Sequence, residues 1–306
     1  MRTVAPPTTR RPALQLIDLA IWVVVLIWGS NFVLLKFALA FMDTLTFDAL
    51  RLSVGALLLL VITVAQEGWR PPPRHDIWKL IGLGLLGNTF YQLPFIIGLR
   101  LTTPGNSSLL IATVPIWTAL LAVALGKERI TLPIWTGVLL STVGVLLVTL
   151  SLSGVSLQSA YLWGDLLTVL AALSWAAYTV FSKELLTRYS PLRLSALALI
   201  PGVLGLWLAA APSAWQLDWA GIPSWLWLVM IASGVLPIAF AYVVWAAAVK
   251  QRGAARTAIY NNAVPLVTFI LAYFTLGEPI MPLQLGGAAL VLLGIWLTSK
   301  RPHAHA

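Results

Sequence analysis

Long apolar stretches separated by short polar segments make up most of the chain. A helix that crosses the hydrocarbon core of a bilayer needs about 20 mostly apolar residues. Membrane-spanning strands would instead alternate apolar and polar residues over about ten positions, and the sequence has no such pattern. We therefore expect an all-α polytopic membrane protein. Its ten predicted transmembrane helices have the approximate bounds 18–40, 45–66, 76–100, 104–125, 131–153, 162–186, 191–212, 222–250, 254–276 and 280–300.

Composition supports this fold class. Of the 306 residues, 59% are hydrophobic and 9% are charged, and the mean hydropathy is +0.91. Because a water-soluble domain carries about 25% charged residues, an ordinary soluble enzyme, a disordered chain and a nucleic-acid-binding domain are excluded. The expected partners are the lipid bilayer and a small-molecule substrate. Cysteine is absent, which excludes disulfides and thiolate metal sites, and the sequence predicts no metal and no cofactor.

The first apolar stretch is predicted to remain in the protein as a span. It continues past 20 residues, through Trp28 to Leu39, without a small-residue cleavage site. A cleavable signal peptide would have a shorter apolar region followed by such a site.

The basic residues give the expected orientation. The net charge is +9, from 19 Lys and Arg against 10 Asp and Glu. Sixteen of the cations fall on one side of the predicted spans, Arg100 lies alone on the other side, and Lys36 and Arg51 lie near the outer ends of the first two spans. Since cytoplasmic loops carry an excess of Lys and Arg, both termini are predicted to be cytoplasmic.

The two halves of the chain resemble each other. Trp28 through Lys36 aligns with Trp175 through Lys183 at an offset of 147, and an offset of 150 pairs Pro115 with Pro265 and Glu128 with Glu278. Glycines 137 and 144 pair with glycines 287 and 294 at the same offset. Because each half holds five predicted spans, the halves are expected to cross the membrane in opposite directions, as in transporters built from inverted repeats.

This repeat gives the predicted organisation of the chain. We expect two five-helix repeats joined by a short outer linker and flanked by cytoplasmic tails, with the bounds 1–17 (tail), 18–153 (first repeat), 154–161 (linker), 162–300 (second repeat) and 301–306 (tail).

Several motifs carry a resemblance to a known family. The W-G-S-N-F segment from Trp28, the W-A-A-Y-T-V-F-S-K segment from Trp175, and the paired V-P-I-W-T…G-K-E and V-P-L-V-T…G-E-P segments are similar to the EamA group of the drug/metabolite transporter superfamily. The likeness covers essentially the whole chain. Within the group the chain looks most like the exporters of aromatic amino acids. The resemblance implies a multi-pass protein of the bacterial inner membrane, and a monomer or homodimer.

Candidate substrate-binding residues are the polar and aromatic side chains within the spans, because such groups are costly in hydrocarbon and mark substrate pathways. Trp and Tyr also gather at membrane interfaces, and buried amides also join helices, so each candidate has a structural alternative. The candidates are Trp28, Asn31, Asn88, Tyr91, Gln92, Trp117, Trp175, Tyr178, Tyr242, Trp245, Tyr260 and Asn261.

Two prolines at matching positions are candidate hinges. Pro115 and Pro265 lie in the middle of predicted spans, where each removes an amide donor and leaves the carbonyl of Ile111 or Asn261 without its helical partner. We expect bends used in gating, and a static kink for packing is the alternative. The glycines of the fifth and tenth spans form small-residue seams, which predict a scaffold or dimer contact.

The charged residues within the spans limit the mechanism. Asp48 and Arg51 are three residues apart near the outer end of the second span and are predicted to pair. Lys36 is expected to extend outward toward the interface, and attraction of a carboxylate-bearing substrate is the alternative. Glu128 and Glu278 are expected to cap helix junctions. The histidines, His75, His303 and His305, lie outside the spans, so the sequence gives no support for a proton relay.

The predicted function is export of small amphipathic metabolites, preferably aromatic or other large apolar amino acids, by alternating access between the two repeats. A cation, a drug or a phosphorylated metabolite is an alternative substrate, although phosphate would call for several deep cations. From a different class, an intramembrane enzyme would need a nucleophile and base or metal ligands at depth, and the sequence supplies neither.

Overall fold

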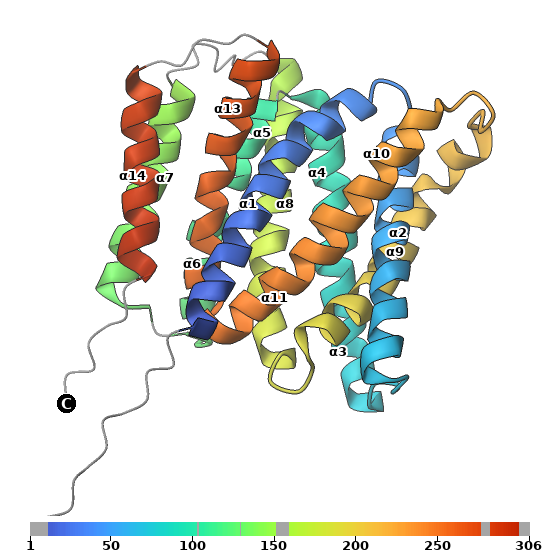
Figure 1. The fold of residues 1–306 in the computed structure, drawn as a ribbon, viewed down its shortest axis with the longest axis horizontal. Coiled ribbons are helices and arrows are strands. Elements are labelled where there is room, and N and C mark those ends of the chain that lie inside the picture. The colour runs from blue at the N-terminus through green and yellow to red at the C-terminus, as the bar shows by residue number, and fades with distance from the viewer. Residues whose placement is uncertain (1–11, 103, 129, 151–158, 277–281, 300–306) are drawn as a thin grey trace, which may run out of the picture.

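Helices form at each apolar stretch that the sequence predicts. The computed structural model describes residues 12–102, 104–128, 130–150, 159–276 and 282–299 (Figure 1). Some predictions fall outside these ranges: those for Glu278, for the tails up to residue 11 and from residue 300, for residues 151–153 at the end of the first repeat, and for residues 154–158 of the linker.

The first half contains eight helical pieces: α1 (Pro12–Ala38), α2 (Thr44–Glu67), α3 (Arg74–Gly84), η1 (Leu85–Thr89), α4 (Phe90–Leu101), α5 (Pro104–Ile111), α6 (Val114–Ala124) and α7 (Leu132–Leu150). The second half contains nine: α8 (Ser159–Leu185), α9 (Pro191–Gln216), α10 (Ser224–Gly234), η2 (Val235–Phe240), α11 (Ala241–Arg252), α12 (Ala254–Ala258), η3 (Ile259–Ala263), α13 (Val264–Leu276) and α14 (Pro282–Ser299).

Six of the described helical stretches are long and apolar enough to cross a membrane. They are Leu16–Ala38, Thr44–Glu67, Arg74–Leu101, Leu162–Leu185, Pro191–Gln216 and Ser224–Arg252. Three shorter helical segments, Val114–Ala124, Leu132–Gly144 and Leu285–Leu297, are also apolar. The fold is therefore that of a helical membrane protein.

Four of the predicted spans are interrupted, and the interruptions come in matching pairs. η1 and η2 are π-helical segments that follow Gly84 and Gly234, which are 150 positions apart. The span that contains Pro115 is divided between α5 and α6, and the one that contains Pro265 passes through the 3-10 segment η3 before α13. Both spans are thus interrupted next to the proline, because proline cannot donate the amide hydrogen bond that a continuous helix requires, and a gating role for these breaks stays a prediction.

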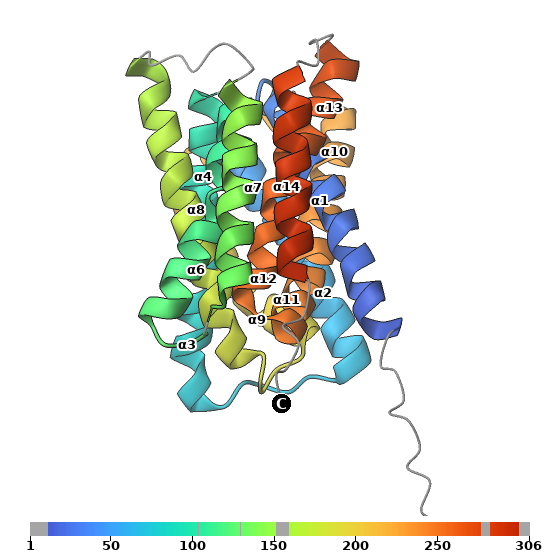
Figure 2. The ribbon, with the colours of Figure 1, turned by 90° about the vertical axis from the view of Figure 1, so that its left-hand side faces the viewer.

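Two helix pairs form the edges of the bundle. At one edge α7 and α14 lie side by side (Figures 1 and 2), and at the other α2 packs on α9. A Cβ atom on Gly144 would lie 2.5 Å from the carbonyl oxygen of Gly287, and one on Gly294 would lie 2.5 Å from that of Gly137. The predicted small-residue seam therefore joins α7 to α14 within the chain, since only glycine permits this approach.

A carboxylate caps one helix junction, as the sequence predicts for Glu128. Its oxygens accept hydrogen bonds from the backbone amides of Ala254 and Ala255 at the start of α12, and it pairs with Lys183 at 2.5 Å. Gly253, which precedes this helix, has φ +89°, and a Cβ atom there would lie 2.7 Å from the Glu128 carboxylate. Glycine is thus required both by the backbone conformation and by the cap.

The end of the bundle where α1 begins is tied together by ion pairs between the two halves. Six such pairs are Asp18–Arg252, Glu67–Arg193, Asp76–Arg188, Lys79–Glu184, Lys127–Glu184 and Glu128–Lys183. Tyr189, in the loop that follows α8, donates a hydrogen bond to Asp76 at 2.9 Å. Burial and this hydrogen bond raise the pKa of Tyr189 to about 12, so the hydroxyl stays protonated as a donor.

Candidate functional site

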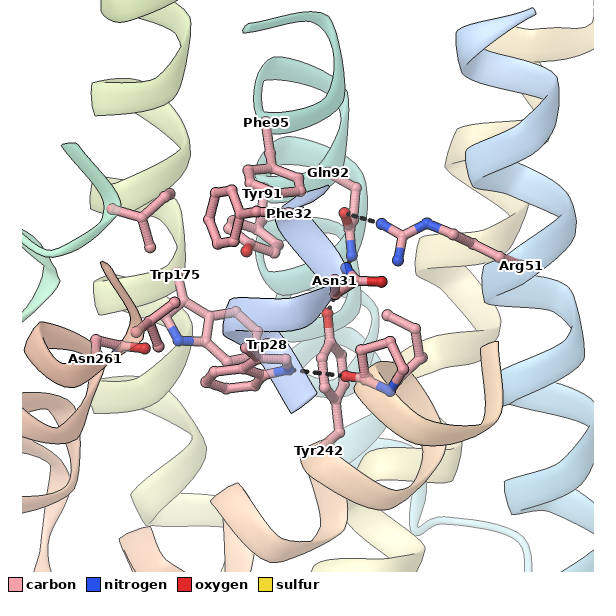
Figure 3. A pocket seen from close by; sticks show the side chains of 14 residues that line it. Trp28, Asn31, Phe32, Arg51, Tyr91, Gln92, Phe95, Trp175, Tyr242 and Asn261 are labelled. Atoms are coloured by element: carbon pink, nitrogen blue, oxygen red, sulfur yellow. Dashed lines mark hydrogen bonds between the residues drawn. The ribbon is translucent and has the colours of Figure 1, made fainter. Parts of the chain in front are cut away.

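A pocket lies in the interior of the bundle, between the two edge pairs (Figure 3). The empty space within it, including the part that is open to the outside, is about 490 Å³. Its lining residues are Trp28, Asn31, Phe32, Arg51, Tyr91, Gln92, Phe95, Ile111, Trp175, Pro237, Ile238, Tyr242, Asn261 and Val264.

Helical periodicity explains how two helices present several side chains to this pocket. On α1, Trp28, Asn31 and Phe32 are three and four residues apart and therefore share a face. On α4, Tyr91 and Phe95 are four apart in the same way. The pocket is completed by residues from helices of both halves, far apart in the sequence.

Trp175 lies at the centre of an aromatic wall. Its ring centroid is 5.7 Å from that of Trp28, 4.9 Å from that of Tyr91 and 5.1 Å from that of Tyr242. Trp28 is also fixed by a hydrogen bond, because its Nε1 donates to the carbonyl oxygen of Pro237 at 3.0 Å. The rings thus form a rigid apolar surface that suits a flat or bulky apolar group.

A chain of polar side chains adjoins this wall. Arg51 is 1% exposed, and its Nη2 lies 2.6 Å from Asp48 Oδ1 and donates to Gln92 Oε1 at 2.9 Å. Gln92 Nε2 in turn donates to the hydroxyl of Tyr242 at 3.3 Å. The prediction that Asp48 and Arg51 pair is confirmed. The pair is fully buried, however, and the guanidinium reaches the pocket.

Two amides in the pocket have atoms without a hydrogen-bond partner among the described residues. They are Asn31 Oδ1, an acceptor, and Asn261 Nδ2, a donor, and both residues are buried. Buried polar groups are normally paired, because leaving one unpaired costs about 1–3 kcal/mol. Unpaired amides that border a cavity are therefore available to a bound solute.

Seven of the twelve predicted substrate-binding residues line this pocket: Trp28, Asn31, Tyr91, Gln92, Trp175, Tyr242 and Asn261. Two more support its wall from behind. Tyr178 stacks on Trp175 with centroids 5.0 Å apart, and Trp245 packs against Trp28 at 5.1 Å while its Nε1 donates to Thr179 Oγ1.

The other three candidates lie elsewhere. Asn88 Nδ2 donates to the carbonyl oxygens of Gly84 and Ala198, which joins α3 to α9. Trp117 Nε1 donates to Thr113 Oγ1, one turn earlier in the same span.

Tyr260 donates to Asp18 at 2.9 Å, at the end of the bundle where the ion pairs lie. The sequence shows that a polar residue lies within a span, but it does not show which face of the helix turns toward the pocket. Asn88, Trp117 and Tyr260 therefore met the same criterion as the residues that line the pocket.

Arg51 is the most informative lining residue outside the predicted set. Its position within a span is the signal that points to it, because an intramembrane cation marks a functional site. Lys36 lies outside the pocket. Its Nζ donates to the carbonyl oxygens of Leu99 and Thr102 at 2.8 and 2.7 Å, so it caps the end of α4.

Comparison with known proteins identifies relatives that cover about nine tenths of the chain. An uncharacterised transporter of Bacillus subtilis, YyaM, is 28% identical, over 89% of this chain and 89% of its own. A probable terminal-alkyne amino-acid exporter of Streptantibioticus cattleyicolor is 29% identical, over 92% and 94%. A probable amino-acid metabolite efflux pump of Salmonella typhimurium is 28% identical, over 90% and 91%.

A solved crystal structure shares the fold. It covers 93% of this chain and 96% of its own with a TM-score of 0.76, at 18% sequence identity. The profile of the EamA-like transporter family matches the sequence twice, over residues 15–150 and 162–300, once in each half. The chain therefore belongs to the EamA-like transporter family, with two copies of the family's unit.

Proposed function

We propose that this protein is a secondary transporter that exports small amphipathic metabolites, with aromatic and other large apolar amino acids as the preferred substrates. The observation that carries the proposal is the composition of the pocket, in which an aromatic wall adjoins a short polar chain with unpaired amides nearby. A large apolar side chain fits the wall, and a small polar head fits the amides. Two of the relatives are named for the export of amino acids or their metabolites.

Transport is proposed to proceed by alternating access between two inverted repeats. Matched contacts support this plan. A Cβ atom on Gly55 in α2 would lie 2.9 Å from the carbonyl oxygen of Gly234, and one on Gly202 in α9 would lie 2.8 Å from that of Gly84. Gly55 and Gly202 are 147 positions apart and Gly84 and Gly234 are 150 apart, which are the two offsets of the sequence repeat.

The directions of the helices agree with inversion. Asp18 near the start of α1 pairs with Arg252, and Lys183 near the end of α8 pairs with Glu128, which caps the helix that follows Arg252. The start of α1 and the end of its proposed counterpart α8 therefore lie at the same end of the bundle. Such an arrangement lets one conformation convert by rocking into a second one, in which the two repeats have exchanged their conformations about a pseudo-twofold axis in the membrane plane.

The breaks at Pro115 and Pro265 are proposed as the hinges of this motion. α5 ends at Ile111 and α13 begins at Val264, and both residues line the pocket. Interrupted helices are tolerated at membrane depth where they border a cavity. A bend at these points would change the wall of the pocket directly.

In the proposed orientation both termini are cytoplasmic and the protein lies in the bacterial inner membrane. The end of the bundle where α1 begins holds many of the basic residues, among them Lys79, Lys183, Arg188, Arg193 and Arg252, and this agrees with the excess of Lys and Arg in cytoplasmic loops. Export then moves substrate from that side to the other.

The pocket favours an amphipathic solute over the alternative substrates. A phosphorylated metabolite calls for several cations around the phosphate, and among the described lining residues Arg51 is the one cation. An organic cation would meet that same charge. An intramembrane enzyme is further disfavoured because the family and its relatives are transporters.

Uptake into proteoliposomes tests the proposal. The purified protein is reconstituted and offered a panel of aromatic, aliphatic and cationic solutes and sugar phosphates, with and without a pH gradient. We expect transport of phenylalanine-like and large aliphatic amino acids. Transport of sugar phosphates without transport of phenylalanine would overturn the substrate class. Faster transport in the presence of a proton gradient would identify a proton-coupled exporter. Asp48, a buried carboxylate within a span, would then be the first residue to test for a role in coupling.

Alanine substitutions connect the transport to the pocket. Asn31→Ala and Tyr242→Ala are expected to impair transport while the protein remains expressed and folded. Tyr273→Ala serves as a comparison, because Tyr273 is 41% exposed and does not line the pocket. Unchanged transport in both pocket variants would remove this pocket as the substrate site.

A further inference from the structure

We propose that Arg51 binds the carboxylate of the substrate, and that the pocket thereby selects zwitterionic α-amino acids over amines and over simple carboxylic acids. This assignment rests on the proposed function. It deepens that function by naming the group that recognises the polar head of the solute.

The burial of Arg51 gives the first argument. Among the described residues Arg51 is the only Lys or Arg that is fully buried. A buried ion pair is weak evidence for stability, since the cost of removing two charges from water can exceed their attraction. A pair kept in the interior of a membrane protein, next to a cavity, is by contrast a typical mark of a substrate pathway.

The geometry of the guanidinium gives the second argument. Nε donates to Asp48 Oδ1 at 2.7 Å, and Nη2 donates to Gln92 Oε1 at 2.9 Å. Nη1 has no partner among the described residues, and Figure 3 shows it pointing to the side of the pocket where Asn31 and Tyr242 lie. Asp48 and Gln92 therefore hold the group in place and leave two N–H donors for a ligand, and the planar guanidinium matches a carboxylate well.

The charge balance gives the third argument. Arg51 and Asp48 together carry no net charge, so a carboxylate that entered alone would leave an uncompensated negative charge in a buried site. A zwitterion brings its own ammonium group and keeps the site neutral. Asn31 Oδ1, which is buried and unpaired, is an acceptor for that ammonium, and the face of Trp28 or Trp175 adds a favourable cation–π surface.

The two halves of the chain differ at this point. At the offset of 147, the positions that correspond to Asp48 and Arg51 in α2 are Ser195 and Ala198 in α9. Trp28 by contrast has an equivalent in Trp175. The aromatic wall is thus shared between the halves, whereas the cation comes from one half only. A single carboxylate site in a pocket of otherwise matched walls gives a bound amino acid one preferred orientation.

A competition experiment in proteoliposomes tests the assignment. Uptake of labelled phenylalanine is measured against four unlabelled compounds that share the benzyl group: phenylalanine, phenethylamine, 3-phenylpropionate and phenylalaninamide. We expect the last three to inhibit about tenfold or more weakly than phenylalanine, because each lacks one charge of the zwitterion. Equal inhibition by phenylalanine, phenethylamine and phenylalaninamide would overturn the role of Arg51 and leave the proposed function intact.

Variants connect the selectivity to the residue. Arg51→Gln alone leaves Asp48 as an unpaired buried charge, so the double variant Asp48→Asn with Arg51→Gln is compared with it. In the double variant we expect the preference for phenylalanine over phenethylamine to disappear. Retention of the full preference would overturn the assignment.

Arg100→Gln is the matched control, because Arg100 is bonded to Thr44 and does not line the pocket. We expect this variant to keep the preference for phenylalanine. The absence of uptake of every amino acid by the unmodified protein would overturn the proposed function and this assignment together.

Discussion

At the residue scale, a single side chain in this protein can make both ring contacts and a hydrogen bond. Trp28 contacts the rings of Trp175 and Trp245 and donates from its indole nitrogen to the carbonyl oxygen of Pro237. That carbonyl belongs to the π-helical segment η2, where π-type turns often accompany functional sites. Trp28 therefore connects the aromatic wall to a backbone segment that is itself irregular.

Substitution of Trp28 separates these two contributions. Trp28→Phe keeps a ring but loses the hydrogen bond, which contributes about 0.5–1.5 kcal/mol, so we expect a loss of apparent substrate affinity of less than about tenfold. Trp28→Ala also removes two aromatic contacts worth about 0.5–1.5 kcal/mol each, so a loss of about tenfold or more is expected. The substrate concentration that gives half-maximal transport measures the loss of affinity in each variant.

Trp163→Ala is the control for this pair, because Trp163 is 68% exposed at the start of α8. Thermal melting in detergent shows whether the variants remain folded. A Trp28→Ala protein that melts normally and transports with unchanged affinity would contradict a role for this ring in the site.

At the element scale, glycines and prolines determine where helices approach each other and where they break. The π segments η1 and η2 each follow a glycine at which a Cβ atom would collide with the backbone of the opposite half, at Ala198 and at Arg51. Removal of these glycines would push α3 from α9 and α10 from α2. The close contacts between helices therefore occur at matching positions of the two halves, as the sequence motifs do.

The seam between α7 and α14 gives a prediction with an internal control. Alanine at Gly294 would place Cβ 2.5 Å from the backbone oxygen of Gly137 and 2.8 Å from Cβ of Ser141. Such overpacking costs about 1–3 kcal/mol, so we expect Gly294→Ala to lower the melting temperature in detergent.

Gly286 lies on the same helix, with nothing within 4 Å of an added Cβ. Because alanine is favoured over glycine in a helix interior by about 0.5–1 kcal/mol, Gly286→Ala is expected to be neutral or stabilising. Equal melting temperatures for the Gly294→Ala and Gly286→Ala proteins would show that the seam does not constrain the fold.

At the scale of the whole molecule, charge is distributed unequally between the two ends. The six ion pairs between the halves all lie at the end where α1 begins. At the other end, the bonds from Lys36, Arg100 and Thr102 run to backbone oxygens, Thr44 and Asp165. In this conformation the halves are therefore held together at one end by charge, and we expect that end to be the closed one.

Neutralising two of these pairs is expected to favour the conformation that is open at this end. Each partly exposed pair contributes about 0.2–1 kcal/mol, so Asp18→Asn with Glu128→Gln is expected to shift the equilibrium by about two- to thirtyfold. The chain has no cysteine, so a single cysteine at the fully buried Ile21 can be labelled with a maleimide without further changes. We expect labelling to be faster in the double variant.

Asp165→Asn is the control, since Asp165 accepts from Thr102 at the opposite end. It is expected not to accelerate labelling at position 21. If the double variant and this control label at the same rate as the parent, the ion pairs do not hold this end closed.

Sequence alone determined the class, the helices and the family of this protein, because hydrophobic length, proline position and motif spacing are local properties of the chain. The breaks next to Pro115 and Pro265 followed from the same local rules, whereas the helix that Glu128 caps begins 126 positions further along the chain. The seven pocket residues among the candidates were predictable as polar or aromatic groups within spans.

Only the tertiary structure decided which of those groups meet. Asn88 and Tyr260 satisfied the same sequence criterion as Asn31 and Tyr242, yet they pack elsewhere, because an apolar helix gives little sign of which face it turns inward. Lys36 donates to backbone carbonyls at the end of α4, and the sequence of its own helix does not indicate this contact. The sequence predicted Arg51 only as a paired charge near a helix end. In the structure it lines the pocket, because Gln92 and Tyr242, which lie 41 and 191 positions later in the chain, extend its hydrogen bonds into the pocket. Contacts of this kind depend on the distances between helices, and the sequence of a single helix does not determine those distances.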